Sequence, residues 1–553
     1  MDAMQRLVDL DAVARLRSHD ATLFGDDPAD VSLVSTSLGW TDLAERGGAV
    51  LPELHRLAAM AADEEVTDIV LLGMGGSSLA SLVLSSVLGG AGRAKVHVLD
   101  TTSPRTVDAA LASLDPSSTL YVVASKSGGT VEPNALYAIF RDVADQALGR
   151  TAAGQRFIAV TDPGSSLEAL AAADGFRALV SSPPTVGGRF SAMSVFGLVP
   201  AALSGLDVDL LLERAHAMET ACSKPPAENP AAALAAFVAD AAATGRDKLT
   251  IVASPQLASF GLWVEQLVAE SLGKEGRGVV PVVELSDDKP RGYGSDRCIA
   301  IVRLEGDERL AEWAEQLADS APVIELLLRD GYDVAAEWTR WEHAVALLGP
   351  LFGVNPFGQP NVQAAKDATK AALAEELERR TPHIETSQGA SITFAGSLPC
   401  PDHPEMDMAR AIGHALATLR PHDYLAILAY LPDDEILLSP LVSAVPRVTE
   451  ALSSATTLEL GPRYLHSTGQ LHKGGPNTGV FLLVTTRDHA DAPVPGKPWT
   501  LRMLHRAQAE GDLCTLADAG RRVLLIDLPD ATCDSITGFA HSLMNAAGVV
   551  WEA

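Results

Sequence analysis

Short apolar runs, each followed by a polar turn and a helix-forming stretch, recur between residues 68 and 160 and constrain the fold most. The runs span 68–72, 95–99, 119–124 and 156–160, and a helical pattern covers 132–147. Strands buried on both faces of a parallel sheet have such continuous apolar sequences, and helices connect them. The alternation therefore predicts a mainly parallel, doubly wound α/β sheet.

A second unit of the same kind begins near Glu228, and a third, mixed α/β unit follows it. In the second unit we expect strands at 248–252, 279–285 and 298–304, and helices over 260–272, 308–351 and 361–380. Residues 381–404, rich in Ser, Thr, Gly and Pro, are the best linker candidate. The third unit has expected strands at 424–430, 480–485 and 523–526. The predicted division is a helical segment 1–63, α/β domains 64–227 and 228–380, and a C-terminal α/β unit 381–553.

Composition narrows the class of protein. The 553 residues are 47% hydrophobic and carry a formal net charge of −29, so most of the surface should repel nucleic acid and anionic membranes. An anionic metabolite can bind only in a locally positive pocket.

Five scattered cysteines without CxxC spacing argue against a disulfide framework and a zinc site. No secretory signal and no apolar stretch near the roughly 20 residues of a membrane span is visible, so we expect a cytoplasmic protein.

Two turns at strand ends have the residues of a phosphate site. In Gly73–Ser78, glycines such as Gly76 let the backbone approach an anion, and Ser77 adds a hydroxyl donor before a helix. The second turn also follows a strand and precedes a helix, and combines hydroxyls with a lysine in Ser125, Lys126, Ser127 and Thr130. Neither has the spacing of a nucleotide-binding loop. Both turns would face one crevice of the sheet, which favours a small phosphorylated ligand, although helix-capping turns remain the plain alternative.

Three further segments carry candidate catalytic side chains. Gly188 precedes Arg189, whose guanidinium could neutralise a developing oxyanion. Gln266 and Glu270 share one helix face just before Gly273, where a carboxylate could act as a general base. Lys366 follows Pro360 by less than two helical turns. Taken singly, each of these side chains is more often simply solvated or part of a helix cap.

Together and in this order, the five segments resemble the phosphoglucose isomerase family, which has two sugar-isomerase (SIS-type) α/β domains. The chain is most similar to the isomerase half of bacterial transaldolase–phosphoglucose isomerase fusions, whose tails also resemble the segments Gly461–Gln470 and His472–Asn477. The resemblance implies interconversion of glucose 6-phosphate and fructose 6-phosphate through a cis-enediol, with a hexose phosphate substrate and no metal or other cofactor.

The resemblance also implies roles for the residues. Phosphate would be held by Ser77, Ser125, Lys126, Ser127 and Thr130, beside the backbone of Gly76 and Gly188. Glu270 would carry the proton between C1 and C2, and Arg189 would stabilise the enediolate. Gln266 would orient a sugar hydroxyl, and Lys366 would assist ring opening.

One expected group is missing from its usual place. Family members carry a ring-opening histidine between the catalytic glutamate and the lysine, but here that stretch holds only His343, in a segment that looks like a packed helix. We hypothesise that the C-terminal unit supplies a substitute through His466 or His472, since both lie in a polar, glycine-rich stretch. A plain turn before the strand at Val480 is the alternative.

Two other functions stay open at this point. A relative with the same fold could also isomerise mannose 6-phosphate, or the chain could be a non-catalytic sugar-phosphate-binding module. The family is commonly dimeric with residues crossing between subunits, so we expect a homodimer. The C-terminal unit could then complete a neighbour's site instead of its own.

Overall fold

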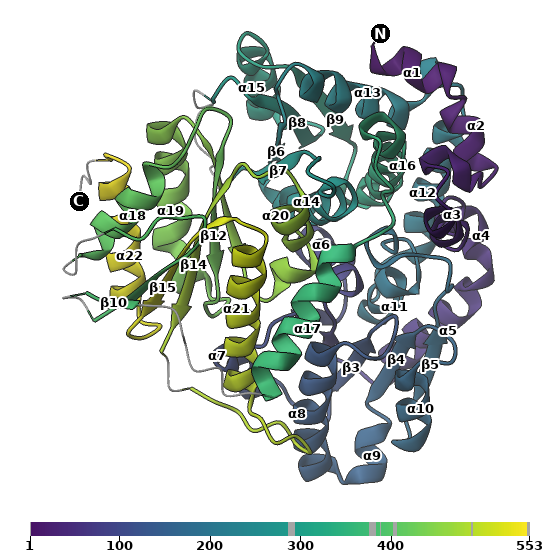
Figure 1. Ribbon diagram of the computed structural model, residues 1–553. Coiled ribbons are helices and arrows are strands. Elements are labelled where there is room, and N and C mark those ends of the chain that lie inside the picture. Colours follow the sequence, from purple (N-terminus) through teal and green to yellow (C-terminus); the bar gives the residue numbers. More distant parts are fainter. Residues whose placement is uncertain are drawn as a thin grey trace.

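Three sheets form the framework of the computed structural model, which describes residues 2–285, 293–374, 383–386, 389–401, 406–487 and 490–549 (Figure 1). Helices cover both faces of each sheet, as in layered α/β proteins. The predicted α/β class, with two parallel sheets and a mixed C-terminal unit, is confirmed. The predicted domain boundaries stay a prediction.

The first sheet is fully parallel, with the strand order β2-β1-β3-β4-β5. Its strands are β1 (Asp68–Leu72), β2 (Lys95–Leu99), β3 (Thr119–Ala124), β4 (Phe157–Thr161) and β5 (Ala178–Ser181). The helices of this part and of the N-terminal segment are α1 (Ala3–Asp9), α2 (Ala12–Arg17), α3 (Pro28–Ser35), α4 (Leu43–Arg46), α5 (Leu51–Asp63), α6 (Leu79–Leu88), α7 (Pro104–Ser113), α8 (Val131–Leu148), α9 (Arg150–Gly154), α10 (Ser166–Ala173), α11 (Val195–Ser204) and α12 (Val208–Cys222).

The second sheet is also parallel, in the order β7-β6-β8-β9. Its elements are α13 (Pro230–Ala243), β6 (Lys248–Ala253), α14 (Ala258–Leu272), β7 (Val280–Val283), β8 (Arg297–Leu304), α15 (Glu308–Ala318), β9 (Val323–Leu328) and α16 (Val334–Phe352). Unbroken helix over 308–351 was therefore a wrong expectation, because β9 interrupts it. The polar Glu325 interrupts this edge strand, so it lacks the continuous apolar sequence of a buried strand.

The third sheet is mixed, in the order β10-β11-β15-β14-β12-β13. Two antiparallel pairings, β10 with β11 and β11 with β15, sit at one edge, and the remaining pairs are parallel. Its elements are β10 (His383–Glu385), β11 (Ser391–Gly396), α18 (Met408–Leu416), β12 (Tyr424–Ala429), α19 (Glu435–Leu452), β13 (Ala455–Leu460), α20 (Gly469–Gly474), β14 (Gly479–Thr486), α21 (Leu501–Asp518), β15 (Arg522–Leu528) and α22 (Cys533–Ala546). Strand β11 lies inside the expected linker 381–404, part of which is outside the described residues.

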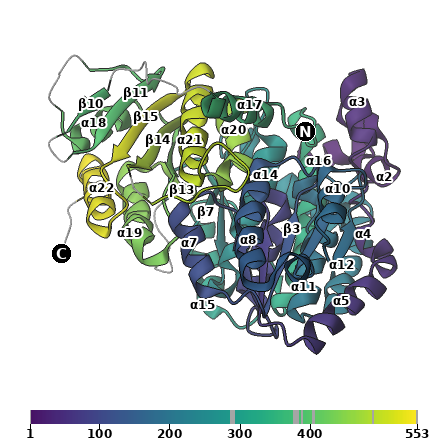
Figure 2. The same ribbon diagram turned by 90° about the horizontal axis from the view of Figure 1, so that it is seen from below.

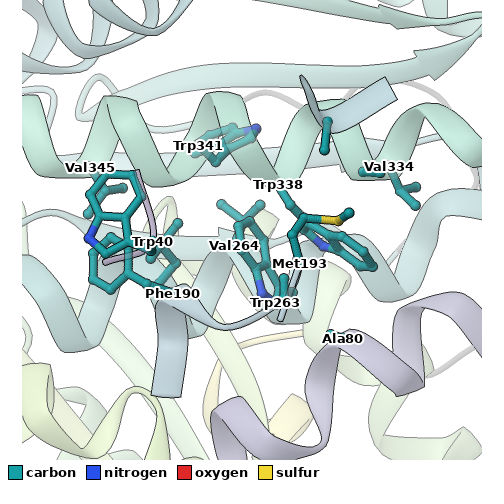
Figure 3. Packing of buried hydrophobic residues seen from close by; sticks show 14 of the residues in the cluster. Trp40, Ala80, Phe190, Met193, Trp263, Val264, Val334, Trp338, Trp341 and Val345 are labelled. Atoms are coloured by element: carbon teal, nitrogen blue, oxygen red, sulfur yellow. The ribbon is translucent and has the colours of Figure 1, made fainter. Parts of the chain in front are cut away.

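The first two sheets share one core. Trp40 stacks on Phe190 with ring centroids 4.8 Å apart, and Trp263 of α14 lies 6.1 Å from Trp338 of α16. Figure 3 shows these rings packed among aliphatic side chains from several helices. Large buried aromatic rings contribute strongly to stability, and here they anchor the helix that bears Glu270.

The C-terminal sheet lies to one side, with α18, α19 and α22 on its outer face (Figure 2). Its inner face carries α20 and α21. Helix α17 (Pro360–Ala374) packs along α21, and Gly511 permits their close approach, since a Cβ there would lie 3.0 Å from the Thr369 nitrogen. This helix pair joins the C-terminal unit to the first sheet. The predicted helix 361–380 is present as far as Ala374, and its remainder lies outside the described residues.

His343 is a core residue of α16. Its ring contacts Trp40 edge-on at 4.9 Å, its Nδ1 lies 2.8 Å from the Thr339 carbonyl oxygen, and burial lowers its pKa to about 4. The unfolded chain binds a proton at His343 between pH 6.5 and about 4 whereas the folded chain does not. Stability is therefore lost as pH falls through this window, by about 3 kcal/mol for this group.

Replacing His343 is expected to make the stability of the fold less sensitive to acid. Between pH 6.5 and 4.5, the melting temperature of His343→Gln should fall less steeply than that of the wild type, because the group that must bind a proton is gone. His414→Gln, at the partly exposed surface of α18, is the control and should follow the wild-type slope. Parallel curves for His343→Gln and the wild type would contradict the assignment.

Candidate active site

The two turns predicted to bind phosphate lie at the same edge of the first sheet. Strands β1 and β3 are parallel neighbours, and the chain passes from β1 to β2 on one side before it returns to β3 on the other. Ligands bind at such switch points, outside the carboxyl ends of the strands. In the turns, Ser125 donates a hydrogen bond to Thr130 at 3.2 Å, and Ser77 is half-buried.

Glycines bring the first turn against three other segments. A Cβ at Gly76 would lie 2.2 Å from the carbonyl carbon of Gly188, so only glycine fits beside the loop that carries Arg189. Gly75 has φ +56°, and its Cβ would lie 3.0 Å from both Gln266 Nε2 and the Cβ of His466. The turn therefore lies next to the arginine loop, helix α14 and the C-terminal unit.

Glu270 and Arg189 form a buried ion pair. Arg189 Nη1 lies 2.9 Å from Glu270 Oε1, and the two side chains are only 4% and 7% exposed. Arg189 Nε donates to Ser271 Oγ at 2.7 Å, and its Nη2 donates to the carbonyl oxygen of Pro356. Charges in so dry an environment interact strongly and keep their positions.

Gln266 connects this pair to the C-terminal unit. Its Nε2 donates to Glu270 Oε2 at 3.3 Å and to the main-chain oxygen of His466 at 2.6 Å. One amide thus separates the Glu270 carboxylate from the backbone of His466. Within one chain, the C-terminal unit thus places His466 against Gln266 of the same chain.

A cleft of about 720 Å³ opens beside His466. It lies among the start of α8, helices α17 and α21, and the turn at His466. Its lining includes the predicted residues Ser127, Thr130, Lys366 and His466, together with Glu132, Lys370, Trp499 and Gln508. Lys366 is exposed and faces this space from α17. The cleft is large enough for a sugar phosphate and has lysine side chains at its border.

His466 is paired with a carboxylate that sequence reasoning did not assign. His466 Nε2 lies 2.9 Å from Glu132 Oε1, which also accepts from Gln508 Nε2 at 2.7 Å. Burial alone would raise the pKa of Glu132, but His466 and Lys366 hold it below its ordinary value. The carboxylate is therefore ionised and can orient His466. In the sequence, the one feature that could have pointed to Glu132 is its position seven residues after Ser125, in the same predicted phosphate-binding segment.

Two predicted residues are engaged elsewhere. His472 is 1% exposed, with Nδ1 2.9 Å from the Tyr424 hydroxyl and Nε2 2.9 Å from Glu459. The Lys126 ammonium is paired with Asp162 and donates to the Pro184 carbonyl oxygen at 2.9 Å. Neither residue lines the cleft. The cleft lining also does not include the predicted residues Gly76, Ser77, Ser125, Gly188, Arg189, Gln266 and Glu270. His472 lies away from the cleft because its ring packs against Phe481 on the inner face of the C-terminal sheet.

Lys274 is a second residue that sequence reasoning left without a role. It is buried beside Arg189, and its ammonium donates to the carbonyl oxygens of Asn355, at 2.8 Å, and of Gly358. Burial lowers its pKa to about 7. Lys274 thus holds the same loop that Arg189 contacts. In the sequence, only its position in the segment Gln266–Lys274 could have pointed to Lys274.

Two buried oxygen atoms at the site make no hydrogen bond within the described part of the chain, Gln266 Oε1 and Glu132 Oε2. Such atoms are rare in folded proteins, and a bound hydroxyl group would satisfy them. Among the described residues, no group of three or more His, Cys, Asp and Glu side chains is placed to hold a metal ion. No described helix has the length and hydrophobicity of a membrane span.

Comparison with known proteins matches residues 58–282 to the phosphoglucose isomerase family. A glucose-6-phosphate isomerase from Synechococcus sp. (strain JA-3-3Ab) is 31% identical over 389 residues, which cover 61% of this chain and 72% of the relative. The chain belongs to the phosphoglucose isomerase family. The predicted family is confirmed, whereas the likeness to transaldolase–phosphoglucose isomerase fusions stays a prediction. The matched residues include Arg189, Gln266 and Glu270 but not Lys366 or His466.

One further relative and two solved structures are also similar to this chain. The glucose-6-phosphate isomerase of Rubrobacter xylanophilus is 29% identical over 65% of this chain and 92% of its own length. A crystal structure of a hypothetical protein from Thermus thermophilus has a TM-score of 0.57 and 28% identity, covering 68% of this chain and 97% of its own. The glucose-6-phosphate isomerase of Chlamydia trachomatis, 19% identical with a TM-score of 0.56 over 68% of this chain and 86% of its own, shares the fold.

Proposed function

We propose that this chain is an enzyme that interconverts glucose 6-phosphate and fructose 6-phosphate. The observation that carries the proposal is the buried Glu270 carboxylate, held between Arg189 and Gln266 next to His466. Isomerisation needs one base that moves a proton between two neighbouring carbons, and one cation beside the oxygen that becomes negative. Relatives that are glucose-6-phosphate isomerases support the substrate assignment.

The proposed chemistry uses only these side chains. Glu270 removes the proton from C2 of the open-chain aldose, and the electron pair forms the C1–C2 double bond of a cis-enediol. Arg189 stabilises the negative charge on the oxygen. Glu270 then returns the proton to C1, while the hydroxyl proton moves between the oxygens of C1 and C2. No electrons leave the sugar, so no redox group takes part in these steps.

Substrate binding is proposed for the cleft. Ser127 and Thr130 line it at the N-terminal end of α8, where backbone N–H groups and the helix dipole favour a phosphate. Ser125, Ser77 and the backbone of Gly76 and Gly188 complete this end of the site. Lys126 would join only by leaving Asp162. The buried oxygen of Gln266 lacks a hydrogen-bond partner and would accept from a sugar hydroxyl that reaches it.

Ring opening is proposed for His466, with Glu132 as the group that orients it and Lys366 nearby. A histidine held by a carboxylate can exchange protons with the ring oxygen and the C1 hydroxyl. His472 is left out of this proposal because it is enclosed by Tyr424, Glu459 and Phe481.

Replacing the two histidines should affect turnover differently, with a loss expected only for His466. His466→Asn is expected to lower turnover of the ring-closed sugar by about 100-fold, because a proton-transfer group is lost, and to lower the melting temperature as well, because the buried Glu132 loses one partner. His472→Asn should lower the melting temperature, since Tyr424 and Glu459 lose a buried partner. Steady-state kinetics and thermal unfolding measure both effects. Wild-type turnover in His466→Asn would contradict its role.

A coupled assay of the purified chain with glucose 6-phosphate and with mannose 6-phosphate tests the function itself. Turnover of glucose 6-phosphate alone supports the proposal, and turnover of both sugars favours the dual-specificity enzyme. An inactive wild-type chain that still binds hexose phosphate would favour the non-catalytic binding module.

We also propose a cytoplasmic homodimer. All five cysteines are free, and Cys400, Cys514 and Cys533 are exposed, which suits a reducing compartment. The dimer follows from the family resemblance. Light scattering of the purified chain at micromolar concentration gives the mass in solution.

A further inference from the structure

A chain of buried hydrogen bonds continues from His466 into the interior. Glu132 Oε1 accepts from His466 Nε2, at 2.9 Å, and from Gln508 Nε2, at 2.7 Å. Gln508 Oε1 in turn accepts from the Thr102 hydroxyl at 2.6 Å, and the oxygen of that hydroxyl lies 3.0 Å from His505 Nδ1. The function proposed above uses only the first of these contacts and gives the others no role.

Gln508 joins elements that are far apart in the sequence. It lies on α21, whereas Glu132 is in the first turn of α8 and Thr102 is in the turn between β2 and α7. Gln508 is thus 376 positions from Glu132 and 406 positions from Thr102. The three residues are at most 3% exposed. Polar groups buried this deeply need hydrogen-bond partners, and bonds in such a dry environment keep their atoms in place.

Each hydrogen bond beyond His466 has only one possible direction. The ionised Glu132 can only accept, so Gln508 turns its Nε2 toward Glu132 and its Oε1 toward Thr102. The Thr102 hydroxyl gives its only proton to that oxygen, so His505 Nδ1 carries the proton of the last bond. A flipped amide would bring two acceptors together at Glu132. The orientation of Gln508 is therefore fixed by both of its partners.

Gln508 holds one particular oxygen of the Glu132 carboxylate. His466 and Gln508 both donate to Oε1, whereas Oε2 makes no hydrogen bond to any residue that the structure describes. Without Gln508, a single bond would hold the carboxylate, and rotation about its terminal torsion would exchange the two oxygens. Two donors from different elements prevent this rotation and keep Oε1 toward His466.

Gln508 does this without adding a charge. Burial alone would raise the pKa of Glu132, but His466, from the turn after β13, and Lys366, from α17, hold it below its ordinary value. Burial raises the pKa of the neighbouring Tyr430 hydroxyl well above its usual range, so that group is neutral as well. A second carboxylate here would compete for the same cations, whereas an amide only donates to Glu132.

We propose that Gln508 and Thr102 are positioning residues for ring opening, which fix the Glu132 carboxylate so that it orients His466, a role that rests on the isomerase function proposed above. The C-terminal unit then takes part in the site twice. It supplies His466, and through α21 it supplies the group that holds the partner of His466.

Exchange between the α and β anomers of glucose 6-phosphate isolates the ring-opening step. Opening, rotation about the C1–C2 bond and closure convert one anomer into the other, and no C–H bond breaks. By magnetisation-exchange NMR with the full-length chain, Gln508→Leu should lower the catalysed exchange rate about tenfold, because one buried hydrogen bond to Glu132 is lost. KM should change less than about twofold, since the phosphate contacts stay. Glu270→Gln should lose turnover but keep the exchange.

Thr102 offers a matched pair of variants. It does not line the cleft, so it can act on the sugar only through Gln508. Thr102→Val keeps the shape of the side chain without its hydroxyl and should lower the exchange rate about threefold, whereas Thr102→Ser should stay within about twofold of wild type. Thr515→Val is the control on α21, since it removes a hydroxyl that donates to the Gly511 carbonyl oxygen at 3.0 Å, and it should exchange as the wild type does.

Gln508→Glu tests the charge argument and keeps the length of the side chain. Two carboxylates in hydrogen-bond contact share a proton, which raises the pKa of the pair. Because Glu132 must be ionised to orient His466, the acid limb of the exchange rate should move to higher pH by about one unit, and raising the pH should restore the rate. A residue that only stabilised the fold would lower the rate by the same factor at every pH.

The outcomes separate this role from the proposed function. If the wild type exchanges anomers and Gln508→Leu does so at the same rate, Gln508 has no positioning role and the isomerase function stands. A wild type with neither exchange nor turnover would refute the proposed function, and the positioning role with it. Should Gln508→Leu fail to fold, equal exchange rates in Thr102→Val and Thr102→Ser would refute the role.

Discussion

Glu270→Gln is expected to lower kcat for glucose 6-phosphate by about 10³- to 10⁴-fold, with a small change in KM. Glutamine keeps the shape of the side chain and its place between Arg189 and Gln266, but it cannot accept the C2 proton. A positioned general base contributes about 10²- to 10⁴-fold to a rate. The coupled assay measures the loss, and exchange of solvent deuterium into the C2 position should disappear with it.

The matched control is Glu265→Gln on the same helix. Glu265 is buried, and burial raises its pKa well above the usual range, so glutamine resembles the protonated acid already present. It lines a different cavity, with Leu262 and Leu438. We expect at most a few-fold change in kcat. An equal loss in both variants would show that any change on this helix disturbs the site, and a Glu270→Gln enzyme with near wild-type kcat would remove Glu270 as the base.

Arg189→Lys is expected to lower kcat by about 10²- to 10³-fold, the loss seen when one group that stabilises an oxyanion is removed. Lysine keeps a positive charge beside Glu270, so the buried carboxylate is not left unpaired. It cannot contact Glu270, Ser271 and Pro356 at once, as the guanidinium does. Steady-state kinetics should show the loss mainly in kcat.

Arg277→Lys is the control for replacing an arginine that does not contact Glu270. Arg277 donates to the carbonyl oxygens of Phe352, at 2.7 Å, and Gly353, at 3.1 Å, near the end of α16. Its replacement should alter the melting temperature slightly and leave kcat within about threefold, because an exposed pair of hydrogen bonds contributes little. If Arg189→Lys also stayed within threefold, Arg189 would have no part in stabilising the intermediate.

Much of the fold could be predicted because its signals are local. The run 68–72 is strand β1 with the expected bounds, and 119–124 is β3, since continuous apolar residues between polar turns define a buried strand. Signals of edge strands are weaker. Strand β9 was absorbed into an expected helix because the polar Glu325 interrupts its apolar run.

The two phosphate turns could be placed together because parallel strands put their carboxyl ends at one edge of a sheet. The same reasoning could not separate His466 from His472. The two residues are six positions apart in one glycine-rich stretch, and the sequence shows no difference in burial. Residue types alone also could not predict that Glu132 pairs with His466.

By itself, the sequence determined the class of each unit, the positions of most strands along the chain and the turns that end them, because strand periodicity and turn chemistry act over a few residues. Only the tertiary structure decided which distant residues meet. His466 reaches Glu132 across 334 positions because α17 and α21 pack the C-terminal unit against the first sheet. Packing of this kind depends on the shapes of whole faces, and no local pattern in the chain encodes it.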